Sequence, residues 1–564
     1  MGRRLHLHLC AFVVLGVIAI GCGDSKGSSS SSGSTSPTTT AAAVATTAEK
    51  TPQAGGTLTF GQWSPIATLD PAFISGYGTS GGLEIGAIYD RLIEWNPVTK
   101  KYDPKTAESL TANADNTVWT LKVRPNIKFA DGTPYDANAV KINYDRQKAK
   151  NTNVRGLLTS VTDVSVVDAL TVKFTLSEPW GGFPIIFNNS VGMLVSPAAI
   201  QALGDDGLKL NPVNAGAGAF QIDSFKPGES ITLKKNPNYW GGPVYLDSIK
   251  FVTIPGGPAT YDAMKTGTLQ AGFLRDAATI ARAKADGIGS ADSVVNSGEM
   301  LILNVGAEVT CAKEAPAPLC VGKPDGTKIA TSPATKDLKV RQAIAAALDV
   351  KTIDTRANEG KGIPATSLFD SSFPWDPNVS MPKYDVTAAR KLVADAKAAG
   401  WNGRVRLTCG VEDQQRSNEA LAIQAMLKDA GMDVDTTRAA VKVSEQVDDV
   451  ITKKDFDIAC WGLQNTPDDN AIAQLDQFLR STSGSNRTGY KSTAMDAILS
   501  ELKGAGTDQA RTAASKKLAD LWVADLPGVP IFHTPQGVYW TSKVHGIKGT
   551  ALSAAAFDKA WIEH

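Results

Sequence analysis

Two consecutive segments between residues 385 and 460 each have the pattern of a helix that ends in Ala-Gly and is followed by a strand. The first helix is expected to end at Ala399-Gly400 and the second at Ala430-Gly431, because glycine commonly follows the last helical residue. The strands that follow alternate apolar and polar residues, with apolar positions Val405, Leu407 and Cys409, then Phe456, Ile458 and Cys460. Helices that alternate with half-buried strands predict an α/β fold.

Strand and helix patterns also recur elsewhere in the chain. Residues that share one strand face by a period of two are Trp119, Leu121 and Val123, and then Leu170, Val172, Phe174 and Leu176. Asp136 is placed as the N-cap of a helix that begins near Ala137. Residues at the spacing of an amphipathic helix are Ile423, Met426, Leu427 and Ala430.

The length and charge of the chain limit the kinds of protein that it can be. With 564 residues it exceeds what one hydrophobic core usually supports, which predicts several domains. Lys plus Arg number 57 and Asp plus Glu number 57. The balanced net charge therefore gives no indication that the protein binds nucleic acid or an anionic membrane surface.

The first residues have the pattern of an export signal. A basic start at Arg3-Arg4 is followed by a mostly apolar run over residues 9–20, which is short for a membrane span. Residues 19–22, Ala-Ile-Gly-Cys, resemble the lipobox at which bacterial lipoproteins are cleaved and lipidated. We therefore expect a signal peptide over residues 1–21, a lipid on Cys22, and a flexible Ser/Thr/Gly-rich tether over residues 22–54.

Four cysteines remain once Cys10 of the signal and Cys22 are set aside. Export permits disulfides. Cys311 and Cys320 flank a proline-containing segment, so a loop-closing bridge between them is predicted, although three connectivities are formally open. Cys409 and Cys460 lie on apolar strand faces, where core packing as free thiols is the alternative to pairing.

Catalytic patterns are weak in this sequence. Ser80 lies in Gly78-Thr79-Ser80-Gly81-Gly82, which fits a nucleophile pattern, but no apolar strand precedes it. Only His533, His545 and His564 remain outside the predicted signal, and no zinc-spaced cysteine pair or Walker loop is present. We therefore expect a protein that is not an enzyme, with no cofactor and no metal site.

Seven segments, in this order along the chain, resemble those of the family 5 extracytoplasmic solute-binding proteins, the dipeptide-, oligopeptide- and nickel-binding lipoproteins of ABC importers. They are Gly55-Gly56-Thr57-Leu58-Thr59, Leu69-Asp70-Pro71, Ile88-Tyr89-Asp90-Arg91-Leu92, Val123–Phe129 with Asp131-Gly132-Thr133-Pro134, Lys235–Gly242, Val340-Arg341-Gln342-Ala343 and Pro527–Ile531. The stretch around residues 123–134 is the most specific of them.

This resemblance implies the type II periplasmic-binding-protein fold, with two lobes and an extra inserted domain. We expect lobe I from residues 55–85, 205–300 and 520–564, an inserted domain II from 86–204, and lobe II (domain III) from 301–519. Ligand binding would close the lobes around a hinge.

The resemblance also implies where the ligand would bind. Trp63, Tyr77 and Trp461 are the aromatic candidates. Peptide binders of the family place an aspartate three residues after the tryptophan, where this chain has Gln464. A neutral amide cannot replace the charge-assisted bond to a peptide ammonium, so Asp468 or Asp469 would have to take that role, with Asn470 adding a hydrogen bond.

The function that these features predict is capture of a small solute, peptide or peptide-like, and its delivery to an ABC permease with its ATPase. The protein is expected to be an extracytoplasmic monomer that contacts the membrane through its lipid anchor only and binds no nucleic acid. The alternatives are a non-peptide solute such as an oligosaccharide, an opine or a small lipidic or aromatic compound, a surface receptor that does not transport, and an exported hydrolase that uses Ser80.

Overall fold

The computed structural model describes residues 50–79, 81–254, 256–312, 317–411 and 414–564. Residues from Pro52 onward form one compact unit. The predicted signal peptide, Cys22, nearly all of the predicted tether and Ser80 lie outside the described residues.

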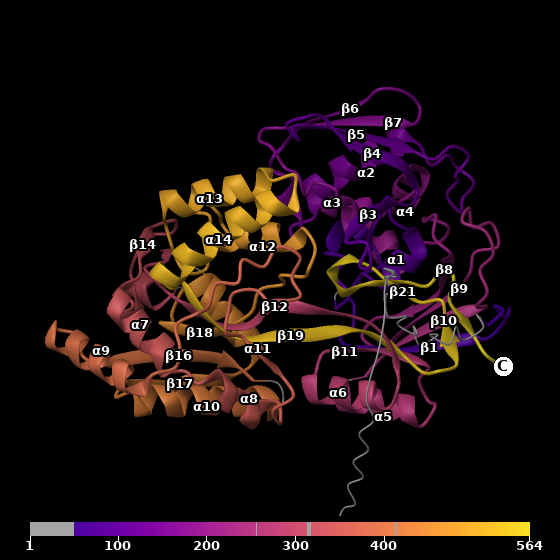
Figure 1. Ribbon diagram of the computed structural model, residues 1–564. Helices are drawn as coiled ribbons and strands as arrows, with labels where there is room; N and C mark the ends of the chain where they lie inside the picture. Colours follow the sequence, from indigo (N-terminus) through magenta and orange to yellow (C-terminus); the bar gives the residue numbers. More distant parts are fainter. Residues whose placement is uncertain (1–49, 80, 255, 313–316, 412–413) are drawn as a thin grey trace, which may run out of the picture. The chain divides into compact units, whose positions relative to one another are not determined.

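A mixed sheet of eleven strands runs through the described part of this unit (Figure 1). In order across the sheet, the strands are β17 (Asp433–Val441), β16 (Arg404–Gly410), β18 (Ile458–Trp461), β12 (Gly289–Leu303), β19 (Gly528–Trp540), β11 (Ala271–Leu274), β1 (Thr57–Gln62), β10 (Ser248–Thr253), β9 (Ser230–Lys235) and β8 (Phe220–Lys226). The short β15 (Ile363–Pro364) pairs with β19 beside this path. Parallel pairs β16–β17, β16–β18, β1–β10 and β1–β11 confirm the predicted α/β class.

Strand β19 takes part in two hydrophobic cores, and the long antiparallel strand β12 pairs with it from one core to the other. Ile302 of β12 and Ile531 of β19 are buried in one core together with Ile458 of β18. Val538 of β19 is buried in another core with Phe60 of β1. We use lobe I for the elements around Phe60 and lobe II for the elements around Ile458. The two strands therefore join the lobes, and ligand sites of α/β folds are found at such junctions.

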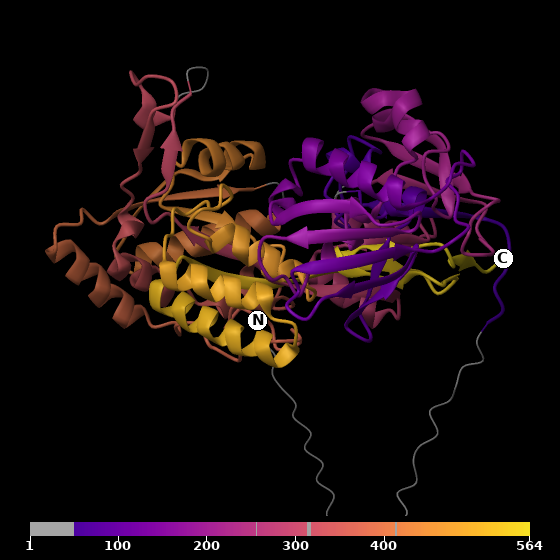
Figure 2. The same cartoon turned by 90° about the horizontal axis from the view of Figure 1, so that it is seen from above.

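A separate four-stranded antiparallel sheet precedes most of lobe I in sequence. Its strands, shown in indigo to purple in Figures 1 and 2, are β4 (Ala107–Ala112), β5 (Val118–Val123), β7 (Thr171–Leu176) and β6 (Val161–Val166). The predicted face of Trp119, Leu121 and Val123 is buried in its own core. Asp136 caps helix α2 (Ala137–Lys150) by accepting the N–H of Ala139 at 2.9 Å, as predicted.

Helices cover the strands of lobe II. They are α7 (Leu338–Ala347), α8 (Val350–Ala357), α9 (Val386–Ala398), α10 (Gln414–Asp429), α11 (Val443–Val447), α12 (Asn470–Leu479), α13 (Thr493–Gly504) and α14 (Asp508–Asp525). The predicted stripe of α10 is confirmed, since Ile423, Leu427 and Ala430 are buried and Met426 is partly buried in the same core. Gly431 follows with φ of 89°, a conformation that ends a helix at low cost only for glycine.

The remaining elements complete lobe I and the inserted sheet. The helices are α1 (Glu84–Tyr89), α3 (Ile185–Asn188), α4 (Pro197–Leu210), α5 (Gly257–Lys265) and α6 (Ala277–Ala285), and the paired strands are β2 (Ile93–Asn96) with β3 (Lys101–Pro104), β20 (Val544–His545) with β23 (Trp561–Ile562), and β21 (Lys548–Gly549) with β22 (Ala555–Ala556). Among the described residues, each helix is too short or too polar to cross a bilayer.

Two disulfides are present in the described residues. Cys311 and Cys320, with Cα atoms 5.3 Å apart, close a loop next to the hairpin of β13 (Glu308–Thr310) and β14 (Lys328–Ala330). Cys409 and Cys460 are also bonded, with Cα atoms 4.8 Å apart. The core-packing interpretation of this second pair missed the bond, because sequence spacing does not show that β16 and β18 are neighbours.

A buried carboxyl group near β1 supplies a test of pH dependence. Burial raises the pKa of Glu84 from 4.5 to about 7, although the side-chain amide of Gln62 donates to it. Stability from this group is therefore greatest below pH 4.5 and falls as the pH rises through 7, by about 3 kcal/mol. We therefore expect the free energy of unfolding of Glu84→Gln, minus that of the parent, to increase by about 3 kcal/mol between pH 4 and pH 8. Urea unfolding measures this difference.

The exposed Glu108, on β4 with its side chain 43% accessible, supplies the control variant Glu108→Gln. Its profile is expected to run parallel to that of the parent over the same pH range. Parallel profiles for Glu84→Gln as well would contradict the assignment of the pH dependence to Glu84.

Candidate functional site

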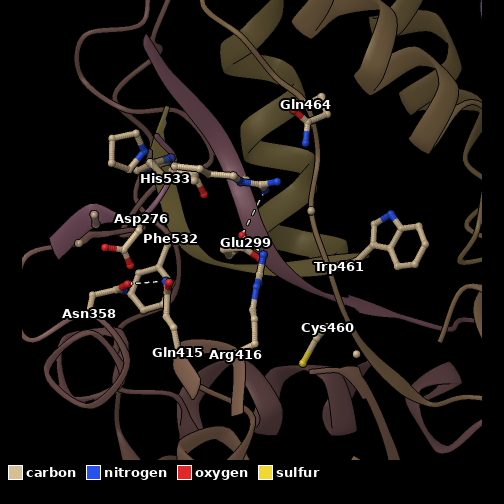
Figure 3. Close-up of a pocket in the computed structure, with 18 of the residues that line it drawn as sticks. Asp276, Glu299, Asn358, Gln415, Arg416, Cys460, Trp461, Gln464, Phe532 and His533 are labelled. Atoms are coloured by element: carbon tan, nitrogen blue, oxygen red, sulfur yellow. Dashed lines mark hydrogen bonds and ion pairs between the residues drawn. The ribbon is translucent and has the colours of Figure 1, made fainter. Parts of the chain in front are cut away.

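A cavity of about 330 Å³ lies between lobe I and lobe II (Figure 3). Lobe I lines it through Trp63 and residues 275–277, whereas lobe II contributes segments near the ends of β16 and β18 and the start of α10. Gly298, Glu299 and residues 532–535 of the two joining strands also line it. The cavity therefore has walls from both lobes and from the strands that join them.

The lining residues gather because the parallel strands of each lobe end toward the middle of β19, those of lobe I from one direction and those of lobe II from the other. Trp63 follows β1, Arg275 follows β11, and Gly410 ends β16 shortly before Arg416. Residues 461–464 end and follow β18 in the same way. Side chains just beyond the carboxyl ends of parallel strands are the usual position for a ligand site in an open α/β sheet.

An irregularity in β12 directs Glu299 into this cavity. The pairing of β12 with β19 shifts register between Val295 and Glu299, and Ser297 has φ of 49°. The N–H of Ser297 donates to Nδ1 of His533 at 3.2 Å. Such bulges turn a side chain away from the direction that a regular strand would give it.

Glu299 lies at the centre of a cluster of ion pairs (Figure 3). Both of its carboxylate oxygens accept from the guanidinium of Arg416, and Nη2 of Arg275 lies 3.4 Å from Oε1. Arg416 also lies 3.4 Å from the buried Glu419. Arg275 belongs to lobe I and Arg416 to lobe II, so this one carboxylate connects the two lobes.

His533 adds a neutral group to the cavity wall. It is only 3% exposed, and this burial lowers the pKa of its imidazole from 6.5 to about 4, against the opposing effect of Asp370. The ring is therefore uncharged at neutral pH. Neighbouring amides are engaged with each other, since Gln415 donates to Asn358 at 2.7 Å.

Three of the residues predicted for the ligand site, Trp63, Trp461 and Gln464, line this cavity. In Figure 3 the side chain of Gln464 extends toward the side of the Glu299 cluster, and that of Trp461 projects from its backbone away from the cluster. Their roles in binding stay predictions.

The other four predicted residues, Tyr77, Asp468, Asp469 and Asn470, lie outside the lining of this cavity. Tyr77 donates to Asn470 at 2.8 Å, and burial raises its pKa well above 10. Asp468 accepts the N–H of Leu552 at 3.2 Å. Because it is buried, the pKa of Asp468 is raised to about 6.

Asp469 is engaged in the same region. Its carboxylate lies 3.0 Å from Nη2 of Arg511, and burial raises its pKa while Arg511 opposes that shift. In this structure both aspartates are thus held by protein groups, and neither takes the position that an ammonium-binding aspartate would need in the cavity. No local sequence pattern indicates these contacts, because it does not show which loop of lobe I meets residues 468–470.

Sequence reasoning missed Glu299, Arg275, Arg416 and His533 as site residues. Glu299 is the one acid in the otherwise apolar stretch that ends β12, which was a usable signal. Arg275-Asp276 directly follows the apolar strand β11, and charged residues at the end of a parallel strand are a second usable signal.

Residues 101–486 match the family model described as bacterial extracellular solute-binding proteins, family 5 Middle. The chain belongs to solute-binding family 5. The resemblance drawn from the sequence segments is therefore confirmed. Within the described residues, no three His, Cys, Asp or Glu side chains are grouped so that they could hold a metal ion.

Curated relatives of this family 5 chain include the glutathione-binding protein GsiB of Salmonella paratyphi A and of Escherichia coli O157:H7. Each is 26% identical over 296 residues, which is 51% of this chain and 52% of the relative. The match thus spans about half the length of these curated relatives.

Solved structures show the same fold over most of the chain. The periplasmic binding protein DppA of Helicobacter pylori in complex with the peptide STSA has a TM-score of 0.72 at 21% identity, covering 91% of this chain and 99% of that one. AgaA of Agrobacterium tumefaciens with agropinic acid has a TM-score of 0.69 at 23% identity, covering 90% and 99%. The predicted two-lobed, multidomain fold of periplasmic binding proteins is confirmed.

Proposed function

We propose that this protein captures a small solute, with peptide-like compounds as the leading class, and delivers it to the permease of an ABC importer. The observation that carries the proposal is the cavity whose walls come from both lobes and from the two strands that join them. A ligand in that position contacts both lobes, so it stabilises the closed arrangement that a permease can recognise.

The proposed domain division gives this mechanism its moving parts. Lobe I takes residues 55–85, 205–300 and 520–564, the inserted domain takes 86–204, and lobe II takes 301–519. Membership of family 5 and the separate hydrophobic cores support two lobes and an inserted domain, although Trp522, Leu526 and Ile531 pack in the core of lobe II and so belong with that lobe.

The experiment that tests capture is thermal unfolding against a panel of solutes. The protein lacking residues 1–22 is unfolded and refolded to strip carried-over ligand, then mixed with di- to hexapeptides, sugars, opines and nickel chelates. Binding to the native state raises the Tm with the logarithm of ligand concentration over Kd. A shift with one class names the solute, and a cooperative melt that no solute shifts contradicts capture of these classes.

A non-peptide solute is the second candidate, and Gln464 favours it because this position lacks the charge that would pair with a peptide ammonium. The solved relative AgaA carries agropinic acid. The panel above contains both classes. Measuring solute uptake by cells that lack the gene separates transport from a receptor role. Loss of uptake indicates a component of an importer, whereas unchanged uptake indicates a receptor.

Replacing Trp461 by Ala is expected to weaken solute binding about tenfold, because an aromatic wall supplies on the order of 1–2 kcal/mol of contact. Isothermal titration with the solute found in the panel measures the change. Trp401→Ala is the matched control, because Trp401 is also partly buried against the core of lobe II but lies outside the cavity lining. Unchanged affinity in a folded Trp461→Ala protein would remove this segment from the site.

Anchoring through Cys22 is part of the same proposal. A lipid at this residue and a tether over residues 22–54 would hold the lobes near the permease while leaving them free to rotate. We expect radiolabelled palmitate to be incorporated by the parent and not by Cys22→Ala, with the variant released into the soluble extracytoplasmic fraction. Equal labelling of both proteins would contradict lipidation at this cysteine.

A further inference from the structure

The charged groups that line the cavity are already engaged with the protein. Both oxygens of Glu299 accept from Arg416, and Arg275 pairs with one of them. The fourth charged lining residue, Asp276, caps helix α6 by accepting the N–H of Thr279 at 2.6 Å. Among the described residues that line the cavity, two arginines are thus balanced by two carboxylates.

Burial of Glu299 makes its ion pairs costly to exchange. Its side chain is 8% exposed, and removing one partner from a buried pair leaves a poorly solvated charge. A ligand with a free ammonium would have to compete with both guanidiniums for Glu299. A ligand with a free carboxylate would have to draw an arginine away from it.

Gln415 and Asn358 pair with each other, but one neutral hydroxyl of the lining has no partner among the described residues. The hydroxyl of Thr534 lines the cavity, is buried with the residue 8% exposed, and has no hydrogen-bond partner among the described residues. The side chain of Gln464 extends toward the same space (Figure 3). Buried polar groups in native proteins are nearly always paired, so the hydroxyl of Thr534 is available to a hydrogen-bonding group of a bound ligand.

Two further unpaired polar groups adjoin these in sequence but lie outside the cavity lining. Asn465 follows Gln464 and is fully buried, with neither atom of its amide paired among the described residues. Oε1 of Gln536, two residues after Thr534, is likewise buried and unpaired in the described part of the chain. All of these groups are uncharged, and hydroxyls and amides are the groups that they bind best.

We propose that the cavity selects an uncharged solute that presents hydroxyl or amide groups, and disfavours solutes with a free ammonium or carboxylate. This inference rests on the proposed capture function and narrows its ligand class. Peptides with blocked or cyclised ends and neutral oligosaccharides share this chemistry. The charges around Glu299 are paired with each other and so are not available to the ligand. Thr534 and Gln464 supply hydrogen bonds to it.

Isothermal titration of the ligand-stripped protein tests the charge preference with matched probes. They are trialanine with free ends, N-acetyl-trialanine amide, cyclic dialanine and maltotriose. We expect at least one neutral probe to bind, and trialanine with free ends to bind at least tenfold more weakly than its blocked form or not at all. Binding of the blocked peptides would indicate a ligand with amide groups, whereas binding of maltotriose would indicate a sugar.

Two outcomes of this titration would overturn the inference. Tighter binding of free-ended trialanine than of every neutral probe would reject the neutral cavity while leaving solute capture intact. A cooperative melt with no binding by any probe, and no shift in the wider panel, would reject capture and the inference together.

Two variants test the residues themselves. Thr534→Val keeps the side-chain shape and is expected to weaken the neutral ligand five- to tenfold, whereas Thr162→Val, an exposed threonine on β6, leaves binding unchanged. Gln464→Asp adds an unpaired carboxylate and is expected to improve binding of free-ended trialanine at least tenfold, with Gln201→Asp on the exposed face of α4 as its control. Unchanged affinities in folded Thr534→Val and Gln464→Asp proteins would overturn the assignment.

Discussion

Replacing Arg146 by Met is expected to lower the free energy of unfolding by about 3–5 kcal/mol, which is the loss typical when one partner of a buried ion pair is removed. Arg146 binds both oxygens of Asp70, at 2.7 Å and 2.5 Å, with side chains 6% and 0% exposed. Without the guanidinium, the buried carboxyl of Asp70 would keep only the N–H of Ala72 as a donor in this group of contacts. Urea unfolding at neutral pH measures the change.

Two further variants separate the effect of breaking a buried ion pair from the effect of removing any arginine. Arg390→Met removes a pair with Asp429 in which the side chains are 53% and 58% exposed, and is expected to cost less than about 1 kcal/mol. Adding Asp70→Asn to Arg146→Met removes the lone buried charge and is expected to restore part of the stability. Equal losses for Arg146→Met and Arg390→Met would contradict the buried-pair explanation.

Removing the Cys409–Cys460 disulfide by a double Cys→Ala change is expected to cost about 4 kcal/mol. These cysteines are 51 residues apart, and a cross-link over a loop of that length removes roughly this much entropy from the unfolded chain. The bond also joins the ends of β16 and β18, and Cys460 lines the cavity. We therefore expect weaker solute binding as well as a lower Tm.

The Cys311–Cys320 disulfide provides the internal comparison. It spans only 9 residues, so the same reasoning gives about 2.5 kcal/mol for its removal. It packs in its own small cluster beside the β13–β14 hairpin, and its loss is expected to leave solute affinity unchanged. A larger loss of stability from this pair than from Cys409–Cys460 would contradict the loop-length argument.

Local patterns predicted the secondary structure well where periodicity and caps agreed. The face of Trp119 and Leu121, the cap at Asp136 and the end of α10 before Gly431 all involve residues close in sequence. Hydrophobic period and backbone preference act over a few residues, so they can be recognised without knowing the fold. Seven segments together were also enough to identify the family.

The candidate site was predicted only in part, for a definite physical reason. Trp63, Trp461 and Gln464 follow strands whose carboxyl ends line the cavity, and the family resemblance implied their positions. Asp468 and Tyr77, in contrast, are engaged by partners that lie 84 and 393 residues away in sequence. No local pattern contains that information.

The sequence by itself determined the α/β class, the family, the neutral balance of charge and the absence of the family aspartate at Gln464. Only the tertiary structure decided that Glu299 would meet Arg275 and Arg416, and that Cys409 would face Cys460. Both results depend on the order of strands in the sheet and on the bulge in β12. Strand order brings together residues more than a hundred positions apart, such as Glu299 and Arg416, and the chain's local preferences do not specify it.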